Sequence, residues 1–496
     1  MRCPLHLLGF DFGASSGRAM HGAFDGEKLS VAEIHRFSND PVRAGNTLYW
    51  DVLRLLHEMR QSMLCACEKG IRPVSIGIDT WGVDFGLISK QGAMLSNPVH
   101  YRDARTDGVM ELAEKTLSKE QIFMHTGLAF MGFNTLYQLM ALQNKEPELL
   151  AQADKLLFMP DLFSYFLTGE MGTEYTIAST SQLTNPRTRD WSGEILDAFD
   201  IPESLFTEIQ EPGAIRGTLR ASICKEVGLE GRMQIVAGPQ HDTAAAVAAA
   251  PASEKDFAYI SSGTWSLLGV ETKSPIVSKG VLNANYTNEG GICGTTRVLK
   301  NIMGMWILQE CRRHWAMEGI RKSYDEIVAL AQQEAPFRSL FDPDDARFMP
   351  PGNMPERICA YCRETGQPIP ETAGQFARAI YESLALKYRW SIRRLEKEII
   401  GRTIPCIHVV GGGSRNALFN QMTADAADKP VIAGPGEATV IGNLLMQAMA
   451  LGEIADLQQL RAVVRASFET VAYQPHHSEA WEEAYGKFLA MAKLED

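Results

Sequence analysis

Two serine-glycine turns, one near the start of the chain and one past its middle, constrain the fold more than any other feature. Strand-like residues 7–12 lead into Gly13-Ala14-Ser15-Ser16-Gly17-Arg18, and strand-like residues 257–260 lead into Ser261-Ser262-Gly263-Thr264-Trp265. Small residues let backbone N–H groups approach an anion closely, and hydroxyl and guanidinium groups add donors and charge. Either turn alone is typical of an ordinary hairpin. Their recurrence in matching contexts predicts a polyphosphate held between two domains.

The length of the chain supports a division into domains. A chain of 496 residues exceeds what one hydrophobic core usually supports, so two large domains or three smaller ones are expected. The polar stretch 251–255 lies between a helix-like segment and the second turn, which favours a boundary there. We predict two domains, over residues 1–250 and 251–496.

Charge, apolar runs and cysteine content exclude several classes of partner and site. A net charge of -12 supplies no broad basic footprint, so neither nucleic acid nor an anionic membrane is expected as a partner. No stretch approaches the ~20 apolar residues of a membrane helix, and no signal-peptide segment precedes the first strand, so we expect a cytoplasmic protein. Nine cysteines are too few for a disulfide scaffold, and the pair Cys359 and Cys362 lacks further zinc ligands. The oligomeric state is not predicted.

The first 90 residues predict a strand meander followed by a helix and a further strand. Asp25-Gly26 is a strong hairpin signal, Asp51 is suited to cap a helix, and Gly70 is suited to end it. The last strand delivers Asp79 and the polar and aromatic residues that follow it to the end of a sheet, where ligands bind in open α/β folds. The four strands are expected over residues 5–12, 17–24, 29–37 and 74–78, and the helix over residues 52–67.

The second half repeats this order less cleanly. Strands are predicted over residues 257–261, 265–270, 405–410 and 431–433, and helices over residues 300–315, 372–399 and 438–451. Gly411-Gly412-Gly413 follows the third of these strands and opens a helix. The pattern predicts two related α/β units.

Common nucleotide-binding motifs are excluded. The chain contains no G-x-x-x-x-G-K-[ST] motif, and Asp11-Phe12-Gly13 occurs without the other protein-kinase motifs. The run Gly411-Gly412-Gly413 lacks the spacing and the acidic partner of a dinucleotide fingerprint. The chain is therefore neither a P-loop protein nor a protein kinase.

Segments spread over nearly the whole chain resemble the FGGY carbohydrate kinases. They are Phe10 to Arg18, His241-Asp242-Thr243, Ser262 to Trp265 and Gly411-Gly412-Gly413. Ile78 to Phe85, Asn288 to Gly291 and Lys300 to Gly304 are most similar to the members that phosphorylate L-rhamnulose. The resemblance implies an α/β fold of two duplicated actin/hexokinase-like (ribonuclease H-like) domains with a ligand cleft between them. It also implies ATP and Mg²⁺ as cofactors and a small ketose as substrate.

The resemblance implies a role for each matching position. The general base would be Asp242, and Asp11 would hold magnesium. The sugar would contact Gly82, His241, Asp242, Thr243 and Asn301. ATP would contact Ala14, Ser15, Ser16, Gly17, Arg18, Thr264, Gln309 and Gly412. The N-terminal domain would bind the sugar and the C-terminal domain the nucleotide.

Several alternatives stay open at this stage. Asp242 also suits the N-cap of a helix that begins at Ala244, Gln240 stands where relatives have a small residue, and Asp84 and Arg102 are further candidates for sugar contact. L-fuculose or a ketopentose is the alternative substrate, because the phosphate machinery would be the same. An actin-like or chaperone-like ATPase without sugar chemistry is the alternative of another class.

Overall fold

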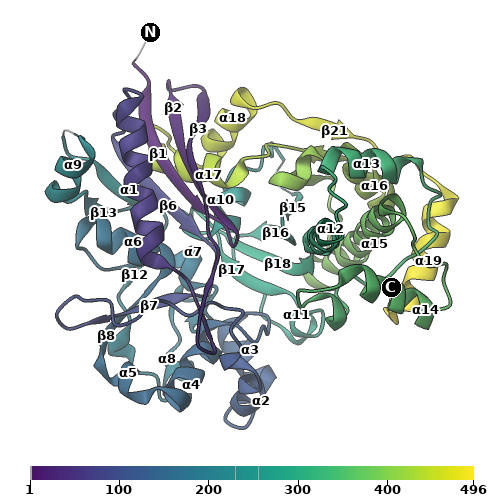
Figure 1. The fold of residues 1–496 in the computed structure, drawn as a ribbon, viewed down its shortest axis with the longest axis horizontal. Coiled ribbons are helices and arrows are strands. Elements are labelled where there is room, and N and C mark those ends of the chain that lie inside the picture. Colours follow the sequence, from purple (N-terminus) through teal and green to yellow (C-terminus); the bar gives the residue numbers. More distant parts are fainter. Residues whose placement is uncertain (1–2, 230, 255, 496) are drawn as a thin grey trace. The chain divides into compact units, whose positions relative to one another are not determined.

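The structure is a computed structural model that describes residues 3–229, 231–254 and 256–495 (Figure 1). Packing divides the chain into two compact units. Unit 1 comprises Met1–Ala249, Glu271–Val298 and Ala438–Ser467, and unit 2 comprises Ala250–Val270, Leu299–Glu437 and Phe468–Asp496. Lys255, in the predicted boundary segment, lies outside the described residues. A domain boundary at residue 250 stays a prediction.

Unit 1 is built on a six-stranded mixed sheet in the order β13-β14-β6-β1-β2-β3. The hairpin strands β1, β2 and β3 are antiparallel, and β6 and β14 continue the sheet in parallel with β1. The six strands, from β1 to β14, are Leu5–Phe12, Ser16–Phe24, Leu29–Ser38, Ser75–Thr80, Ala214–Thr218 and Gln234–Ala237. The predicted meander is confirmed, and the predicted strand 74–78 lies at Ser75–Thr80.

Helices cover both faces of this sheet. One face packs its apolar side chains against α1 (Val52–Glu68), α6 (Met159–Thr168) and α9 (Ala221–Val227). Helix α1 begins at the predicted cap, because the Asp51 carboxylate accepts a hydrogen bond from the backbone N–H of Arg54. The other face carries α17 (Ala438–Ala450). This helix approaches the sheet closely at Gly77, where a Cβ would lie only 2.2 Å from Asn443 Oδ1, so glycine is needed there. A segment near residue 440 is thus part of unit 1.

Further elements of unit 1 form a second core beside the sheet. Strands β7 (Phe85–Ser89) and β8 (Ala153–Phe158) pair antiparallel and pack against α4 (Thr135–Lys145). The remaining elements are β4 (Val42–Ala44), β5 (Thr47–Tyr49), η1 (Ala104–Thr106), α2 (Val109–Ala113), α3 (Lys119–Thr126), α5 (Pro147–Gln152), β9 (Thr173–Glu174), α7 (Tyr175–Ala178), β10 (Thr184–Asn185), β11 (Asp190–Trp191), α8 (Gly193–Ala198), η2 (Glu203–Leu205), β12 (Ile209–Gln210), α10 (Asp242–Ala248), α11 (Lys279–Asn283), β17 (Thr287–Gly290) and α18 (Leu457–Ser467).

The second sheet repeats the strand order of the first. Its order is β17-β18-β16-β15-β19-β20-β21, in which β15 and β16 form an antiparallel hairpin, β19 and β20 continue in parallel, and β21 closes the edge antiparallel. The strands from β15 to β21, apart from β17, are Ala258–Ser262, Trp265–Thr272, Thr296–Met303, Ile407–Val410, Val431–Ala433 and Val471–Tyr473. The predicted duplicated α/β fold is confirmed by this repetition.

Unit 2 surrounds one long helix. Helix α15 (Ala373–Arg394) is buried along most of its length and passes into a π-helical turn at Leu395–Ile400, as the long amphipathic run 372–399 predicted. The other elements of unit 2 are α12 (Trp306–Met317), α13 (Tyr324–Gln333), η3 (Ala346–Phe348), α14 (Met354–Glu364), η5 (Gly412–Arg415), α16 (Ala417–Ala427) and α19 (Glu479–Ala492).

One predicted element is wrong in its first part. The helix expected over residues 300–315 begins only at Trp306, because Thr296–Met303 forms strand β18. The apolar spacing of Ile302, Met305 and Trp306 is helical only by coincidence, since the chain turns at Gly304. A Cβ at Gly304 would lie 2.7 Å from the Trp265 carbonyl carbon, so this turn admits no side chain.

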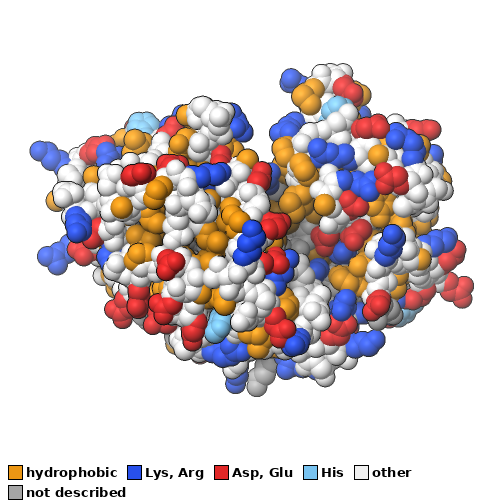
Figure 2. Space-filling model, turned by 90° about the horizontal axis from the view of Figure 1, so that it is seen from below, with side chains coloured by type: hydrophobic (Ala, Val, Ile, Leu, Met, Phe, Trp, Pro, Cys, Tyr) orange, Lys and Arg blue, Asp and Glu red, His pale blue; other side chains and the backbone are white. Residues whose placement is uncertain are grey.

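Two further features concern membrane-spanning segments and surface charge. Among the described residues, no helix combines the length and the apolar character needed to cross a bilayer. On the face drawn in Figure 2, acidic and basic side chains are interspersed.

Candidate active site

The first serine-glycine turn joins β1 to β2. Gly13 N donates to Ser16 O at 2.9 Å, and the Asn39 side chain donates to Gly13 O at 2.8 Å, so the turn is fixed from two sides. A Cβ at Gly17 would lie 2.2 Å from the Phe37 ring, which explains why glycine stands there. Ser15 is exposed, and Ala14, Ser16 and Arg18 are half-buried.

Charged residues gather at the end of β1 and β6. Asp11 stands opposite Arg18 in the antiparallel pair and opposite Asp79 in the parallel pair. Arg18 donates through Nε and Nη2 to Asp11 Oδ2 at 3.0 and 2.7 Å. The predicted phosphate arginine is therefore paired with the predicted magnesium carboxylate.

Asp79 is a fully buried carboxylate that the sequence analysis did not include in the site. Asn443 donates to its Oδ2 at 2.6 Å, whereas Oδ1 is buried without a hydrogen-bond partner among the described residues. Burial raises the pKa of Asp79 well above its usual value, and the charges of Asp11 and Asp242 raise it further. A buried carboxyl oxygen that lacks a donor, on a residue that two other carboxylates influence by their charge, suits a hard cation such as Mg²⁺.

Asp242 reaches this cluster from the turn after β14. The backbone N–H of Thr80 donates to Gln240 O at 2.9 Å, and Thr80 forms a parallel bridge with His241. Helix α10 begins at Asp242, with His241 in the N-cap position. The alternative of Asp242 as N-cap is therefore wrong, because its carboxylate lies one residue inside the helix.

The two oxygens of Asp242 differ in their environment. Oδ1 accepts a hydrogen bond from Thr243 Oγ1 at 3.0 Å and lies 3.4 Å from His241 Nε2. None of the described residues donates a hydrogen bond to Oδ2, and the side chain is 35% exposed. Burial raises the pKa of Asp242, His241 opposes this shift and Asp11 adds to it. Oδ2 is thus an accessible acceptor with raised basicity.

A buried glutamate, which the sequence analysis missed, holds this turn. Glu174 Oε2 accepts hydrogen bonds from Gln240 N, Thr176 Oγ1 and Ile177 N, and Thr176 Oγ1 accepts from His241 N at 3.1 Å. Burial raises the pKa of Glu174 to about 7. The side chain of Gln240, which departs from the family pattern, is itself fully buried.

The segment after β6 is strained at the residue that follows Gly82. Val83 has a φ of 68°, which a β-branched residue rarely adopts. Thr180 Oγ1 accepts from Val83 N at 3.0 Å, and Thr135 Oγ1 donates to Val83 O at 2.7 Å. A Cβ at Gly82 would lie 3.0 Å from the Thr180 side chain, so Thr180 packs directly against the predicted sugar-binding position.

Asp84 organises aromatic side chains. Trp50 Nε1 and Trp81 Nε1 donate to its Oδ2 at 2.6 and 2.9 Å, and Gln138 donates to its Oδ1 at 2.9 Å. Asp84 is 1% exposed, and burial raises its pKa to about 6. Its role in this structure is to anchor Trp50 and Trp81.

The second serine-glycine turn lies in unit 2 and contains no acidic residue. Its carbonyls accept from the start of α12, with Met305 N donating to Gly263 O and Trp306 N to Thr264 O, both at 3.1 Å. Thr264 Oγ1 lies 3.4 Å from Gln309 Oε1, so these two predicted ATP contacts are neighbours.

The glycine run after β19 packs on this turn. A Cβ at Gly413 would lie 2.0 Å from Ser262 Oγ, whereas a Cβ at Gly412 would meet nothing within 4 Å. Gly412 is exposed. Packing against Ser262 thus requires glycine at position 413, whereas Gly412 faces open space.

The predicted site residues are distributed over both units. Unit 1 brings together Asp11, the first turn, His241, Asp242 and Thr243, with Gly82 two residues after β6. Unit 2 brings together Thr264, Gln309 and Gly412, and it also contains Asn301, half-buried on β18.

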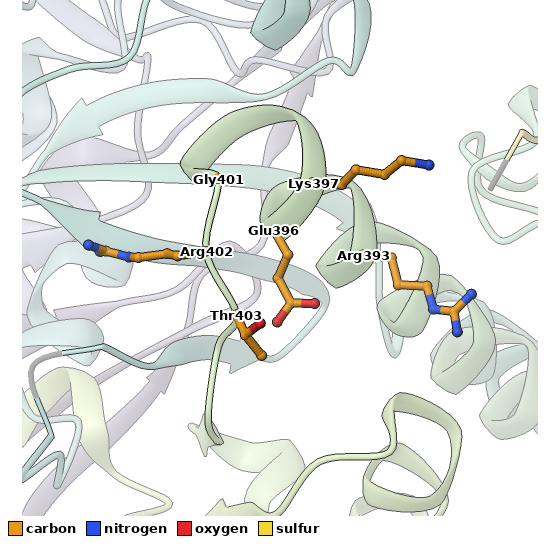
Figure 3. A pocket seen from close by; sticks show the side chains of 6 residues that line it. All are labelled: Arg393, Glu396, Lys397, Gly401, Arg402 and Thr403. Atoms are coloured by element: carbon orange, nitrogen blue, oxygen red, sulfur yellow. The ribbon is translucent and has the colours of Figure 1, made fainter.

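A pocket elsewhere in unit 2 contains none of the predicted residues. It is lined by Arg393, Glu396, Lys397, Gly401, Arg402 and Thr403 around the π-helical turn. Figure 3 shows that the Arg402 side chain points to the side opposite to those of Lys397 and Arg393. The residues that line this pocket do not converge on a ligand.

The comparisons with known proteins agree with a sugar kinase of duplicated α/β fold. Residues 6–248 match the N-terminal domain, and residues 258–451 the C-terminal domain, of the FGGY family of carbohydrate kinases. The chain is 45% identical over 483 residues to a rhamnulokinase of Bacteroides thetaiotaomicron, covering 97% of this chain and 98% of the relative. A rhamnulokinase of Enterococcus faecalis is 44% identical over 490 residues, with 98% of each chain covered.

Solved structures share the fold. A ligand-bound xylulose kinase from Lactobacillus acidophilus superposes with a TM-score of 0.82 at 16% identity, covering 98% of this chain and 97% of that one. Plasmodium falciparum glycerol kinase with ADP superposes with a TM-score of 0.77 at 14% identity, and both chains are covered completely. The protein belongs to the FGGY family of carbohydrate kinases.

Proposed function

We propose that this kinase transfers the γ-phosphoryl group of ATP to the O1 hydroxyl of L-rhamnulose in L-rhamnose catabolism, with Asp242 as general base. The observation that carries the base is the asymmetry of the Asp242 carboxylate, in which only Oδ2 is free of donors from the described residues. The substrate is supported by the rhamnulokinase relatives at 41–45% identity over nearly the full chain.

A primary hydroxyl is a weak nucleophile, so a carboxylate within hydrogen-bond reach must accept its proton as the bond to phosphorus forms. In the proposed step Asp242 Oδ2 takes the O1 proton, the O1–P bond forms, and the bond between the γ-phosphorus and the bridging oxygen breaks. The products are L-rhamnulose 1-phosphate and ADP, and Asp242 then releases its proton. His241, Thr243, Gly82 and Asn301 are proposed to bind the sugar.

The phosphates of ATP are proposed to bind the backbone N–H groups and hydroxyls of residues 14–18, together with Thr264. Gln309 would face the nucleotide and Gly412 the adenosine, where the absence of a Cβ leaves room. Arg18 would add positive charge close to the γ-phosphoryl group.

Asp11 is proposed to hold Mg²⁺, directly or through water, and Asp79 Oδ1 fits as a further acceptor. A bound magnesium ion would neutralise charge on the phosphate oxygens. The two hydrogen bonds from Arg18 to Asp11 Oδ2 restrain this carboxylate, which supports the proposed role.

The substrate is tested by comparing kcat/KM over a panel of L-rhamnulose, L-fuculose, xylulose and ribulose. The proposal expects the highest value for L-rhamnulose. A higher value for L-fuculose or a ketopentose would assign that substrate instead. ATP turnover that does not depend on added sugar would support an actin-like or chaperone-like ATPase.

A further inference from the structure

A buried ion pair lies directly behind His241. Glu289 on β17 and Arg297 on β18 are 3.1 Å apart between Oε2 and Nη2, and the Arg297 side chain is fully buried. Arg297 Nε donates to Gly290 O at 2.8 Å, which fixes the guanidinium plane. Both residues belong to unit 1, as His241 and Asp242 do.

The contacts of this pair determine which ring nitrogen of His241 carries the proton. Arg297 Nη2 lies 3.1 Å from His241 Nδ1 in hydrogen-bond geometry, and Glu289 Oε2 lies 3.4 Å from the same nitrogen. A guanidinium group only donates hydrogen bonds, so Nδ1 must accept. The proton of neutral His241 is therefore on Nε2, which lies 3.4 Å from Asp242 Oδ1.

The consequence reaches the proposed base. With its proton on Nε2, His241 directs an N–H group toward Asp242 Oδ1 at 3.4 Å, the same oxygen that accepts from Thr243 Oγ1, and Oδ2 is left to accept from the substrate. With the proton on Nδ1, His241 would donate to Glu289 and present a lone pair to Asp242 Oδ1, which would repel the carboxylate. The competition between Arg297 and Glu289 for Nδ1 thus decides the orientation of Asp242.

We propose that Arg297, which is paired with Glu289, is a positioning residue that fixes the Nε2-protonated tautomer of His241 against the competing Glu289 carboxylate, so that Asp242 Oδ2 remains free to accept the sugar proton. This inference rests on the proposed function of Asp242. Neither residue needs to touch the sugar, because both act through His241.

Two substitutions separate this role from simple structural support. In Arg297→Met the Glu289 carboxylate is the one partner that the described residues leave at Nδ1, so the tautomer reverses. We expect kcat to fall about tenfold or more, with KM for the ketose changed less than about twofold. In the double variant Glu289→Gln/Arg297→Met the Gln amide can donate to Nδ1, so kcat should recover to within about threefold of the wild type. A purely structural role predicts a double variant no better than the single one.

A conservative control uses a second arginine-glutamate pair of unit 1, Arg461 with Glu271, which has no contact with His241 or Asp242 among the described residues. Glu271→Gln should leave kcat and KM unchanged. If Arg297→Met keeps the wild-type kcat, or if the double variant shows no recovery, the inference is overturned.

The wild-type protein supplies a test that needs no substitution at the ion pair. Two-bond ¹H–¹⁵N correlation spectra at neutral pH, with His241 assigned by His241→Gln, should show a proton on Nε2 only. A proton on Nδ1 overturns the inference even if Arg297→Met does not fold. Full activity in Asp242→Asn would instead remove the proposed base, which is a separate result.

Discussion

The two serine-glycine turns occupy equivalent places in two sheets of the same strand order, yet their surroundings differ in charge. The first turn is flanked by Asp11 and Arg18, with Asp79 on the neighbouring strand. The second turn packs against Gly413 and the start of α12 and contains no acidic residue. The duplicated framework thus provides two turns that we propose to bind phosphate. Among the described residues, the carboxylates that we propose for metal binding lie beside the turn of unit 1.

Among the variants considered, we expect the largest loss of kcat when the proposed base in unit 1 is removed. Asp242→Asn keeps the shape of the side chain but lowers its basicity, so we expect kcat to fall by about 10²-fold or more while ATP binding is nearly unchanged. Steady-state kinetics and ATP titration calorimetry measure the two effects. Asp51→Asn is the matched control, because asparagine caps α1 equally well and kcat should be unchanged. Near-normal turnover in Asp242→Asn would remove this residue from the role.

The next largest effect is expected at Asp79. Asp79→Asn keeps a partner for Asn443 but removes the negative charge near Asp11, so the magnesium concentration for half-maximal activity should rise about tenfold. Activity measured against Mg²⁺ at saturating ATP reveals the shift. An unchanged magnesium dependence would show that Asp79 is not part of the metal site.

In unit 2, the two glycines of one run should respond differently. Gly413→Ala places a Cβ 2.0 Å from Ser262 Oγ, so we expect a loss of stability of about 1–3 kcal/mol. Gly412→Ala meets no atom within 4 Å and should leave the melting temperature unchanged while it raises KM for ATP several-fold. Calorimetry and kinetics on both variants separate packing from binding. An unchanged KM for ATP in Gly412→Ala would contradict its place at the adenosine.

The smallest effect concerns the pH dependence of stability. Burial raises the pKa of Asp84 from 3.8 to about 6, so the folded protein binds a proton that the unfolded chain releases between these values. This contribution to stability, at most about 3 kcal/mol, is fully present below pH 3.8 and is lost as the pH rises through about 6. Asp84→Asn cannot titrate, so its unfolding free energy relative to the wild type should increase by this amount from pH 4 to 7. The unfolding free energies are measured by urea denaturation at pH 4 and at pH 7. A difference between the two proteins that is the same at both pH values would contradict the assigned shift.

Much of the fold follows from local sequence. The strands of unit 1 and the caps at Asp51 and Gly70 are set by alternation and by turn chemistry, which a single sequence displays. The start of α12 could not be predicted in this way, because the turn at Gly304 depends on its contact with Trp265, about 40 residues earlier in the chain.

The candidate site shows the same limit. Family resemblance selects Asp11 and Asp242, but Asp79 and Glu174 emerge only from packing, since their burial and partners join distant segments. Asp79 carried one signal, its place at the end of a buried strand. Arg297 and Glu289 carried none beyond the resemblance of residues 288–291, because their contact with His241 is made by the fold.

The most direct test of the account is the identity of the product. Purified protein, ATP, Mg²⁺ and L-rhamnulose should give one phosphate ester per ADP, and two-dimensional ¹H–³¹P NMR should couple its phosphorus to the C1 protons of the sugar. Without sugar, ADP should not accumulate. A phosphate ester at another carbon, or ADP release that is independent of sugar, would contradict the assignment of Asp242 to the O1 hydroxyl.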